Sequence, residues 1–219
     1  CSSKNIVKVV SVGESPISEK YLNSKNSLPK DIVVPLDLYM CKDCSCVQLI
    51  HVINPDYLWN NFTFKTSRNP KLKNHYQTYA QGVIKFAEHT DKKFILDIGS
   101  NDGTLLKVFK DNGFSKVLGI DPAKEIAKEA TNNGINTIPE YMNKKNAKII
   151  KNKFGSPNLI TANNVFAHID DMDEITDSIV SILDKNGLFI FEISYLLDVI
   201  EKKLLGTIFH EHLSYYSLN

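Results

Sequence analysis

The sequence predicts an α/β fold, with a doubly wound parallel sheet of the Rossmann-like type preceded by a small β module. In the second half of the chain, short apolar runs alternate with amphipathic stretches of helical length, as in a parallel sheet that carries helices on both faces. Residues 1–60 instead contain short β-like segments separated by turn residues. The 219 residues, 42% of them hydrophobic, suffice for one small module and one medium-sized domain.

The N-terminal module is expected to span residues 1–60 and to consist of strands. Its segments with strand character are residues 5–12, 31–40 and 47–52. Residues 13–16 (Gly-Glu-Ser-Pro) combine turn-forming types and predict a turn after the first strand. Residues 61–90 are expected to form a connector and a helix, because apolar residues between positions 72 and 87 recur at helical spacing.

The third part of the chain, residues 91–219, is expected to alternate strands with helices. The expected strands are residues 94–98, 117–120, 136–138, 159–162 and 188–193. The expected helices are residues 104–111, 122–132, 144–153, 172–183 and 195–205. Ligands bind at the carboxyl ends of the strands in such sheets, so candidate binding residues are expected where these strands end.

Composition argues against proteins that bind nucleic acids or span membranes. The 26 basic and 25 acidic residues give a formal net charge of +1, and Arg68 is the only arginine, whereas nucleic-acid binders usually carry a clustered, arginine-rich face. No apolar run approaches the roughly 20 residues that span a bilayer, and no signal peptide is visible. We therefore expect no nucleic-acid or membrane partner, and the clustering of the four cysteines favours a cytoplasmic protein.

The strongest motif, Leu-Asp-Ile-Gly-Ser-Asn-Asp-Gly, overlaps and follows the first expected strand of the third part. Gly99 and Gly103 allow backbone conformations and a close approach that a side chain would block. A dinucleotide-binding loop follows the pattern G-x-G-x-x-G, but here Asn101 holds the middle position. Asp97 and Asp102 would repel a pyrophosphate, whereas their charge suits the ammonium and sulfonium groups of S-adenosylmethionine. The loop, with Asp97, therefore predicts S-adenosylmethionine as the cofactor.

A second acid, Asp121, ends the next expected strand, where a carboxylate can hold both ribose hydroxyls. The alternative is that Asp121 only caps the helix that Pro122 begins. The loop and this acid together resemble the class I S-adenosylmethionine methyltransferases. The resemblance implies a set of residues that line the cofactor: Gly99, Asn101, Gly103, Asp121, Ala162 and Asn163.

The four cysteines are clustered, which suits a reduced metal site better than a disulfide framework. Cys41 and Cys44 form a C-x-x-C pair, whose thiolates can reach one tetrahedral Zn²⁺. Cys1 is a candidate third ligand, as the second member of a pair that begins just upstream. Cys46 and His51 are alternatives for the remaining position. The competing interpretation is that the cysteines are small buried hydrophobic side chains.

Two further segments carry groups that can transfer protons. His168 follows the fourth expected strand of the sheet, and taken alone it suits a structural role as well as a catalytic one. Residues 209–216 contain His210, Glu211 and His212, and an imidazole oriented by a carboxylate is a common general base. Side chains alternate along an extended segment, so at most one of the two histidines in this stretch faces a given site.

Together these segments resemble one family, the sugar C-methyltransferases that act on nucleotide-linked deoxy-ketosugars. The resemblance covers nearly the whole chain and is carried by residues 13–16, 35–38, 41–49, 99–103, 162–168 and 210–217. It implies a zinc-binding domain followed by a cofactor-binding domain, with Zn²⁺ held by Cys1, Cys41 and Cys44. The C-terminal domain of the family is absent after Asn219, so we expect a fragment or a naturally short relative.

The same resemblance implies the chemistry: removal of a proton next to a ketone, then attack of the enolate carbon on the sulfonium methyl group. By motif, His212 matches the base, Glu211 the carboxylate beside it, and His168 a histidine near the enolate oxygen. The family often has tyrosines where this chain has Phe64 and Phe209, which leaves the substrate and the proton relay open. Alternatives are an O- or N-methyltransferase of small molecules, or a zinc-ribbon interaction protein with a degenerate methyltransferase fold.

Overall fold

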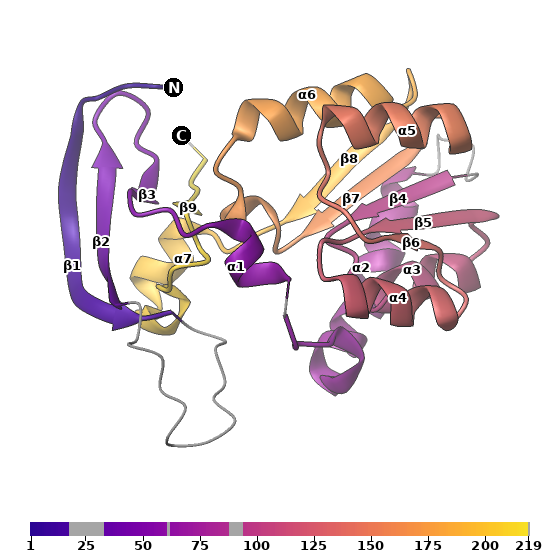
Figure 1. The fold of residues 1–219 in the computed structure, drawn as a ribbon, viewed down its shortest axis with the longest axis horizontal. Helices are drawn as coiled ribbons and strands as arrows, with labels where there is room; N and C mark the ends of the chain where they lie inside the picture. The colour runs from indigo at the N-terminus through magenta and orange to yellow at the C-terminus, as the bar shows by residue number, and fades with distance from the viewer. Residues whose placement is uncertain (18–32, 61, 88–93, 219) are drawn as a thin grey trace. The chain divides into compact units, whose positions relative to one another are not determined.

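The computed structural model describes residues 1–17, 33–60, 62–87 and 94–218 (Figure 1). The chain divides into two compact units. The first unit comprises residues 1–58, 166–170 and 193–219, and the second unit comprises residues 59–165 and 171–192. The C-terminal residues, which the sequence analysis placed with the cofactor-binding domain, thus group with the N-terminal module.

The second unit contains, among its described residues, a five-stranded sheet with the strand order β6-β5-β4-β7-β8. Its strands are β4 (Phe94–Ile98), β5 (Lys116–Ile120), β6 (Thr137–Ile138), β7 (Leu159–Asn163) and β8 (Leu188–Glu192). All of its neighbouring strands are parallel, so their carboxyl ends lie at the same edge. The predicted α/β fold with a parallel sheet is confirmed.

One helix precedes these strands and the others connect them, and together they cover both faces of the sheet (Figure 1). They are α2 (Pro70–Phe86), α3 (Thr104–Asp111), α4 (Lys124–Asn132), α5 (Lys144–Phe154) and α6 (Met172–Ile182). Helix α2 begins after Asn69, whose side chain accepts the backbone N–H groups of Lys71 and Leu72. All five helices were predicted near these bounds, and residues 88–90 of the connector and helix predicted over residues 61–90 lie outside the described residues.

Strand β4 lies at the centre of the sheet, and every one of its residues is buried as a result. Alternate side chains point to opposite faces, so β4 contributes to both layers. On one face, Ile95 packs with Leu106 of α3 and Ala80 of α2, none of which has any exposed surface. Fully burying a side chain such as Leu106 stabilises the fold by roughly 1.5–3 kcal/mol. This packing fixes the strand whose end carries the predicted cofactor loop.

The first unit contains, in the part of the chain that is described, an antiparallel sheet with the order β1-β2-β3-β9. Its strands are β1 (Ile6–Pro16), β2 (Val33–Cys41), β3 (Val47–Leu49) and β9 (Ser214–Tyr215). The turn predicted at residues 13–16 is wrong, because these residues belong to β1 and pair with β2. Gly13 has a φ of +93° and falls at a register shift between Ser11 and Glu14, so its left-handed backbone forms a β-bulge.

The C-terminal segment is tied to the N-terminal module by strand pairing. Tyr215 of β9 pairs with Val47 of β3 and is buried in the hydrophobic core of the first unit. The remaining short elements are α1 (Pro55–Trp59), α7 (Leu196–Glu201) and 3₁₀ turns at Thr66–Arg68, Phe166–His168 and Leu205–Thr207. Helix α7 is shorter than predicted and gives way to Lys203 with a φ of +52°. Within the described residues, no helix has the length and apolar character needed to cross a membrane.

Candidate functional site

The loop after β4 has left-handed backbone at three alternate positions. Gly99 (φ +68°), Asn101 (φ +49°) and Gly103 (φ +77°) adopt this conformation, which glycine and asparagine tolerate best. A Cβ atom on Gly99 would lie 2.4 Å from Cγ2 of Val165, and one on Gly103 would lie 2.8 Å from Cγ2 of Ile135. Both glycines are therefore required by conformation and by packing, and the loop presents bare backbone at the carboxyl edge of the sheet.

Asp121 joins this loop from the end of β5. Its carboxylate accepts the backbone N–H of Asn101 at 2.8 Å and that of Ala123 at 2.8 Å. The contact with Ala123 lies at the start of α4, so Asp121 does cap this helix, as the alternative prediction had it. The contact with Asn101 places the same carboxylate at the loop. Each oxygen keeps a further lone pair for a hydroxyl donor. Burial raises the pKa of Asp121, while the two N–H groups oppose that rise.

The side chain of Asn101 binds a backbone segment that precedes α2. Its Oδ1 accepts the N–H of Thr66 at 2.9 Å, and its Nδ2 donates to the carbonyl of Phe64 at 3.0 Å. The neighbouring Asp102 accepts the N–H of Ser67 at 2.9 Å. The amide of Asn101 therefore acts on the site through this segment, because both of its polar atoms are already engaged.

We refer to residues 64–67 as the strap. Lys65 of the strap also pairs with Glu129 of α4, which adds a third element to its attachments. A hollow of about 400 Å³ adjoins the strap and is lined by Thr63, Phe64, Lys65, Arg68, Asn69 and Pro70. Phe64 in this segment was singled out by the family resemblance, but the attachment of the strap to Asn101 and Asp102 was not predicted, because it uses backbone atoms of the strap, which have no signature in the sequence.

Asp97 is the most deeply buried acid near the loop, with 3% of its surface exposed. The hydroxyl of Thr161 donates to its Oδ1 at 2.7 Å. Burial is the main reason that the pKa of Asp97 rises to about 7, with Thr161 opposing the rise and the charge of Asp121 adding to it. A cation bound nearby would favour the ionised carboxylate, which is consistent with an ammonium or sulfonium ligand.

Buried polar atoms without partners lie at the end of β7, in the middle of α2 and in the loop after β4. Ala162 is fully buried opposite Ile98 of β4, and Asn163 follows it with 8% of its surface exposed. Neither amide atom of Asn163, nor the hydroxyl of Tyr79, nor that of Ser100 has a hydrogen-bond partner among the described residues. Buried polar groups in native proteins are nearly always partnered, so these atoms fit a polar ligand beside the loop.

A hydrogen-bonded pair of side chains lies at the same edge of the sheet. Glu192 at the end of β8 is the register partner of Asn163. Both of its carboxylate oxygens bind Nε2 of His75 on α2, at 2.8 and 3.0 Å. His75, Tyr79 and Glu192 were not among the site residues predicted from the sequence. The helical spacing that predicted α2 included Tyr79 only as an apolar position.

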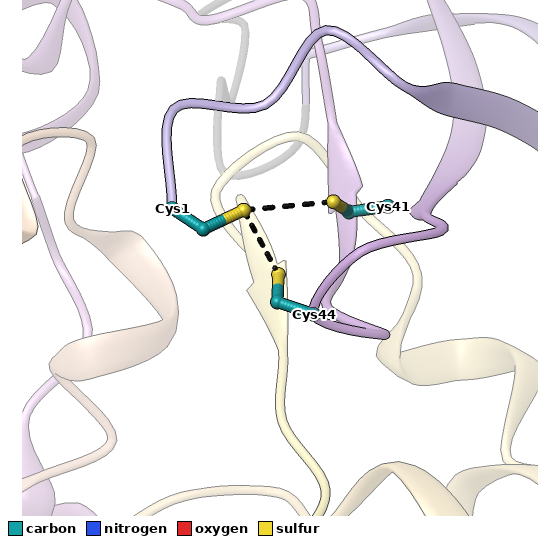
Figure 2. A group of neighbouring side chains, drawn as sticks. All are labelled: Cys1, Cys41 and Cys44. Atoms are coloured by element: carbon teal, nitrogen blue, oxygen red, sulfur yellow. Dashed lines mark hydrogen bonds between the residues drawn. The ribbon is translucent and has the colours of Figure 1, made fainter.

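Figure 2 shows the cysteine group predicted to bind zinc. The sulfur of Cys1 lies 3.6 Å from that of Cys41 and 3.3 Å from that of Cys44, and all three lie within 4.8 Å of one another. Zn–S bonds of about 2.3 Å in a tetrahedron separate the sulfurs by about 3.8 Å, so this group fits one Zn²⁺. The backbone N–H groups of Asp43 and Cys44 lower the pKa of the Cys41 thiol, which favours the thiolate that a metal requires.

The alternative ligands of the sequence analysis are not part of this group. The thiol of Cys46 contacts the carbonyl of Val47 instead, and His51 is not a member either. Ser45 has a φ of +60° and donates its N–H to the carbonyl of Cys41. This tight turn brings Cys41 and Cys44 together.

His212 is held by a backbone carbonyl in the first unit. Its Nδ1 contacts the carbonyl of Thr207 at 2.8 Å, so Nδ1 carries the proton and Nε2 has the free lone pair of the neutral ring. The ring of Phe209 lies 3.9 Å away between centroids. Burial lowers the pKa of His212, while the carbonyl of Thr207 and the charge of Glu211 oppose the change. The imidazole is therefore neutral and basic near pH 7.

A backbone carbonyl is the partner of His212 Nδ1, and the predicted orientation of the ring by the Glu211 side chain stays a prediction. His212 ends a turn that begins at Phe209, and its Nδ1 faces Thr207, so the orienting group is a carbonyl. The carbonyl of Glu211 accepts a hydrogen bond from Nδ1 of His168 at 2.7 Å, and the ring centroids of His168 and His212 lie 5.0 Å apart. The first unit thus brings together all three residues of the predicted catalytic set.

His210 has a different environment from its neighbours in the sequence. It is 1% exposed, and its Nε2 contacts the carbonyl of Val34 in β2 at 3.1 Å. A buried ring bound to backbone in this way holds the C-terminal segment on the sheet. The expectation that only one of the two histidines in this segment faces a site agrees with this geometry.

Comparison with known proteins matches both parts of the chain. Residues 72–219 match the family described as "Methyltransferase domain", and residues 1–59 match the family described as "Putative zinc binding domain". The first match covers more than half of the chain. The chain therefore belongs to the methyltransferase domain family, whose cofactor is S-adenosylmethionine, and it begins with a zinc-binding module.

A curated relative supports the same family. The C-methyltransferase NovU of Streptomyces niveus is 31% identical over 218 residues, which cover 100% of this chain and 52% of the relative. The chain thus spans about half the length of this relative.

Solved structures that resemble part of the chain include the following two. One is an S-adenosylmethionine-dependent methyltransferase from Clostridium acetobutylicum, with 20% identity, a TM-score of 0.48, and coverage of 58% of this chain and 54% of that one. The other is DesVI of Streptomyces venezuelae, with 15% identity, a TM-score of 0.47, and coverage of 55% and 52%.

Proposed function

We propose that this protein transfers the methyl group of S-adenosylmethionine to a carbon atom of a nucleotide-linked ketosugar, by way of the enolate of that sugar. The observation that carries the proposal is the neutral imidazole of His212, which is fixed through Nδ1 and retains a basic Nε2. The relative from Streptomyces niveus is named a C-methyltransferase, which supports carbon as the acceptor atom. The ketosugar follows from the sequence resemblance described above.

The residues proposed to hold the cofactor lie on the second unit. They are Asp97, Gly99, Asn101, Gly103, Asp121, Ala162 and Asn163. When bound, S-adenosylmethionine supplies an electrophilic methyl group on a positively charged sulfur. Gly99 and Gly103 allow close approach, and Asp121 has lone pairs left for ribose hydroxyls. Asn101 contributes indirectly, because its amide holds the strap.

His212 is the proposed base. A carbon next to a ketone is a poor nucleophile until it loses a proton, and a base works best when its pKa lies near the working pH. Imidazole meets that condition, and burial keeps His212 neutral. A positioned base of this kind contributes roughly 10² to 10⁴ in rate. The Thr207 carbonyl also stabilises the imidazolium that forms when Nε2 takes the proton.

His168 is proposed to stabilise the oxygen of the enolate. Its hydrogen bond to the Glu211 carbonyl determines which protonation state of the ring can do so. Its Nδ1 must carry a proton to donate to the Glu211 carbonyl, so Nε2 of the neutral ring has no proton to donate. His168 therefore assists the developing oxygen charge only as an imidazolium.

The zinc module is proposed to have a structural role. Cys1, Cys41 and Cys44 cross-link the segment before β1 to the turn between β2 and β3. Three thiolate ligands on one Zn²⁺ are typical of structural sites. The four cysteines are free thiols. Reduced cysteines fit the cytoplasm, where we propose that the protein acts.

The proposal is tested by incubating the protein with methyl-labelled S-adenosylmethionine and a panel of nucleotide-linked ketosugars in heavy water. We expect exchange of the proton next to the ketone without cofactor, and a labelled carbon–methyl bond with it. Methylation of alcohols or amines, without such exchange, would replace the proposal by an O- or N-methyltransferase. Absence of cofactor binding would favour an interaction protein with a degenerate fold.

A further inference from the structure

The carbonyl of Thr207 accepts hydrogen bonds from two side chains of the first unit. Nδ1 of His212 donates to it at 2.8 Å, and the hydroxyl of Tyr215 donates to it at 3.1 Å. A carbonyl oxygen has two lone pairs, so these two donors together fill its capacity as an acceptor. A change in one of the two hydrogen bonds therefore affects the other.

The backbone of its own turn fixes the position of this carbonyl. The N–H and the hydroxyl of Thr207 both bind the carbonyl of Leu204, at 3.0 and 2.8 Å. The N–H of Ile208 binds the carbonyl of Leu205 at 3.0 Å, which closes the next turn of the chain. Removal of one side-chain donor should therefore leave the Thr207 carbonyl in place for the other.

The hydroxyl of Tyr215 is held in place by the core of the first unit. Tyr215 is 2% exposed, pairs with Val47 of β3 and packs with Leu38 and Leu49. Burial raises the pKa of Tyr215, against an opposing effect of the Phe209 backbone, so the hydroxyl keeps its proton across the neutral range. The hydroxyl is therefore a permanent donor to the carbonyl that also holds the proposed base.

The charge of His212 changes during the proposed reaction, and the Thr207 carbonyl interacts differently with its two forms. An imidazolium N–H makes a stronger hydrogen bond than a neutral imidazole N–H, so a free carbonyl would favour the charged ring. We propose that Tyr215 is a positioning residue for the base: its hydroxyl occupies one lone pair of the Thr207 carbonyl and so limits the stabilisation of the His212 imidazolium. The ring is thereby kept in the neutral form that accepts a proton. This inference rests on the proposed function, because it presupposes that His212 is the base.

Other titratable groups also face the ring of His212. The ring of His168, on the turn Phe166–His168, lies 5.0 Å away between centroids, and the charge of Glu211 favours the imidazolium. The ring of Tyr215 lies 6.2 Å away and is edge-on. A variant that changes only the hydroxyl of Tyr215 leaves His168 and Glu211 in place, so their effects are common to both proteins.

The test is an NMR titration of the His212 ring in the intact protein, together with the pH profile of proton exchange on the ketosugar. Tyr215→Phe should raise the pKa of His212 by roughly half a pH unit, as expected for part of one neutral hydrogen bond, and should move the acid limb of the profile upward equally. Replacement of Tyr215 by 3-fluorotyrosine, whose hydroxyl is a stronger donor, should move both to lower pH. Tyr216→Phe is the matched control, because its hydroxyl donates to the carbonyl of Phe166 at 3.1 Å, and it should leave the pKa of His212 unchanged.

The outcomes separate this inference from the proposed function. An unchanged pKa of His212 in both Tyr215 variants would overturn the inference, even if stability fell, because the hydroxyl would then have a structural role alone. Equal changes in Tyr215→Phe and Tyr216→Phe would overturn it as well. If Tyr215→Phe does not fold, the 3-fluorotyrosine protein decides, because it keeps the hydroxyl. The expected changes in pKa, found in a protein that exchanges no ketosugar proton, would refute the proposed function while the link from Tyr215 to His212 stands.

Discussion

Single residues in this protein owe their chemistry to burial. Asp97 and His212 both lie where their charged forms are disfavoured, so the acid becomes easier to protonate and the imidazole harder to protonate. Neither shift is visible in the sequence, because it depends on which neighbours exclude water. The residue types were predictable from their motifs. The Thr207 carbonyl that orients His212 was not predictable, because a backbone acceptor is present at every position of a chain.

Asp97 should make the ligand-free protein less stable as the pH rises. Its pKa is about 7 in the folded chain and near 3.8 when unfolded, so stability present at low pH is lost as the pH rises to 7. A shift of about three units corresponds to at most about 4 kcal/mol. Asp97→Asn should therefore raise the free energy of unfolding at pH 8 and flatten its pH dependence, measured by denaturant titration. An unchanged pH dependence would contradict the buried charge.

His212→Asn should abolish the base while leaving the cofactor unit intact. We expect proton exchange on the ketosugar to fall by roughly 10² to 10⁴, with unchanged binding of S-adenosylhomocysteine. The acid limb of the wild-type pH–rate profile should lie below pH 6.5, because burial lowers the pKa of His212 and only the neutral ring is a base. The limb should be absent in the variant.

His210→Asn is the matched control for this experiment. His210 is buried against the carbonyl of Val34, so its loss should lower stability by roughly 1–3 kcal/mol. The rate per folded molecule should remain close to wild type. If His212→Asn gave the same result as His210→Asn, the role of His212 would be structural.

At the scale of elements, the spacing of apolar residues predicted individual helices and strands, but not the pairing of strands that lie far apart in the sequence. The helices of the second unit follow from apolar spacing of 3.6 residues, and the strands from short apolar runs, so both were found near their observed bounds. Gly13 is an example of a conformation that the sequence alone leaves open, because a glycine with left-handed backbone suits a turn and a β-bulge equally well. The pairing of β1 with β2 shows that it forms a bulge. The pairing of β3 with β9 joins residues more than 160 positions apart and has no local signal.

The strap provides a prediction at this scale. Asn101→Gly keeps the left-handed backbone but removes the amide that holds Phe64 and Thr66. Two lost hydrogen bonds should cost roughly 1–3 kcal/mol locally, which raises hydrogen exchange at residues 64–67 by about tenfold or more. Mass spectrometry measures this exchange with and without S-adenosylhomocysteine.

Asn164→Gly is the control for the strap experiment. Asn164 also has left-handed backbone, with a φ of +55°, but contributes no hydrogen bond to the strap. Exchange at residues 64–67 should therefore match wild type. Equal exchange in both variants would mean that Lys65 and Asp102 hold the strap without Asn101.

At the scale of the whole molecule, the predicted functions are divided between the two units. The residues proposed to hold the cofactor all lie in the second unit, whereas the zinc ligands and the two imidazoles all lie in the first unit. The first unit is assembled from distant stretches of the chain, because β9 completes a sheet begun by β1. Loss of the metal should therefore affect proton removal without affecting cofactor binding.

Removal of zinc tests that division. Cys1, Cys41 and Cys44 cross-link two segments 40 residues apart, so the metal opposes unfolding of the first unit. Chelation, or Cys41→Ser, should remove several kcal/mol and lower the thermal midpoint of that unit by roughly 10 °C or more. Proton exchange on the ketosugar should fall, because His168 and His212 depend on the same sheet, while calorimetry should still detect S-adenosylhomocysteine. Cys46→Ser changes a thiol outside the group of Cys1, Cys41 and Cys44. This variant should leave the metal content, the proton exchange and the binding of S-adenosylhomocysteine near wild type. If chelation abolished cofactor binding as well, the two units would not be independent in stability.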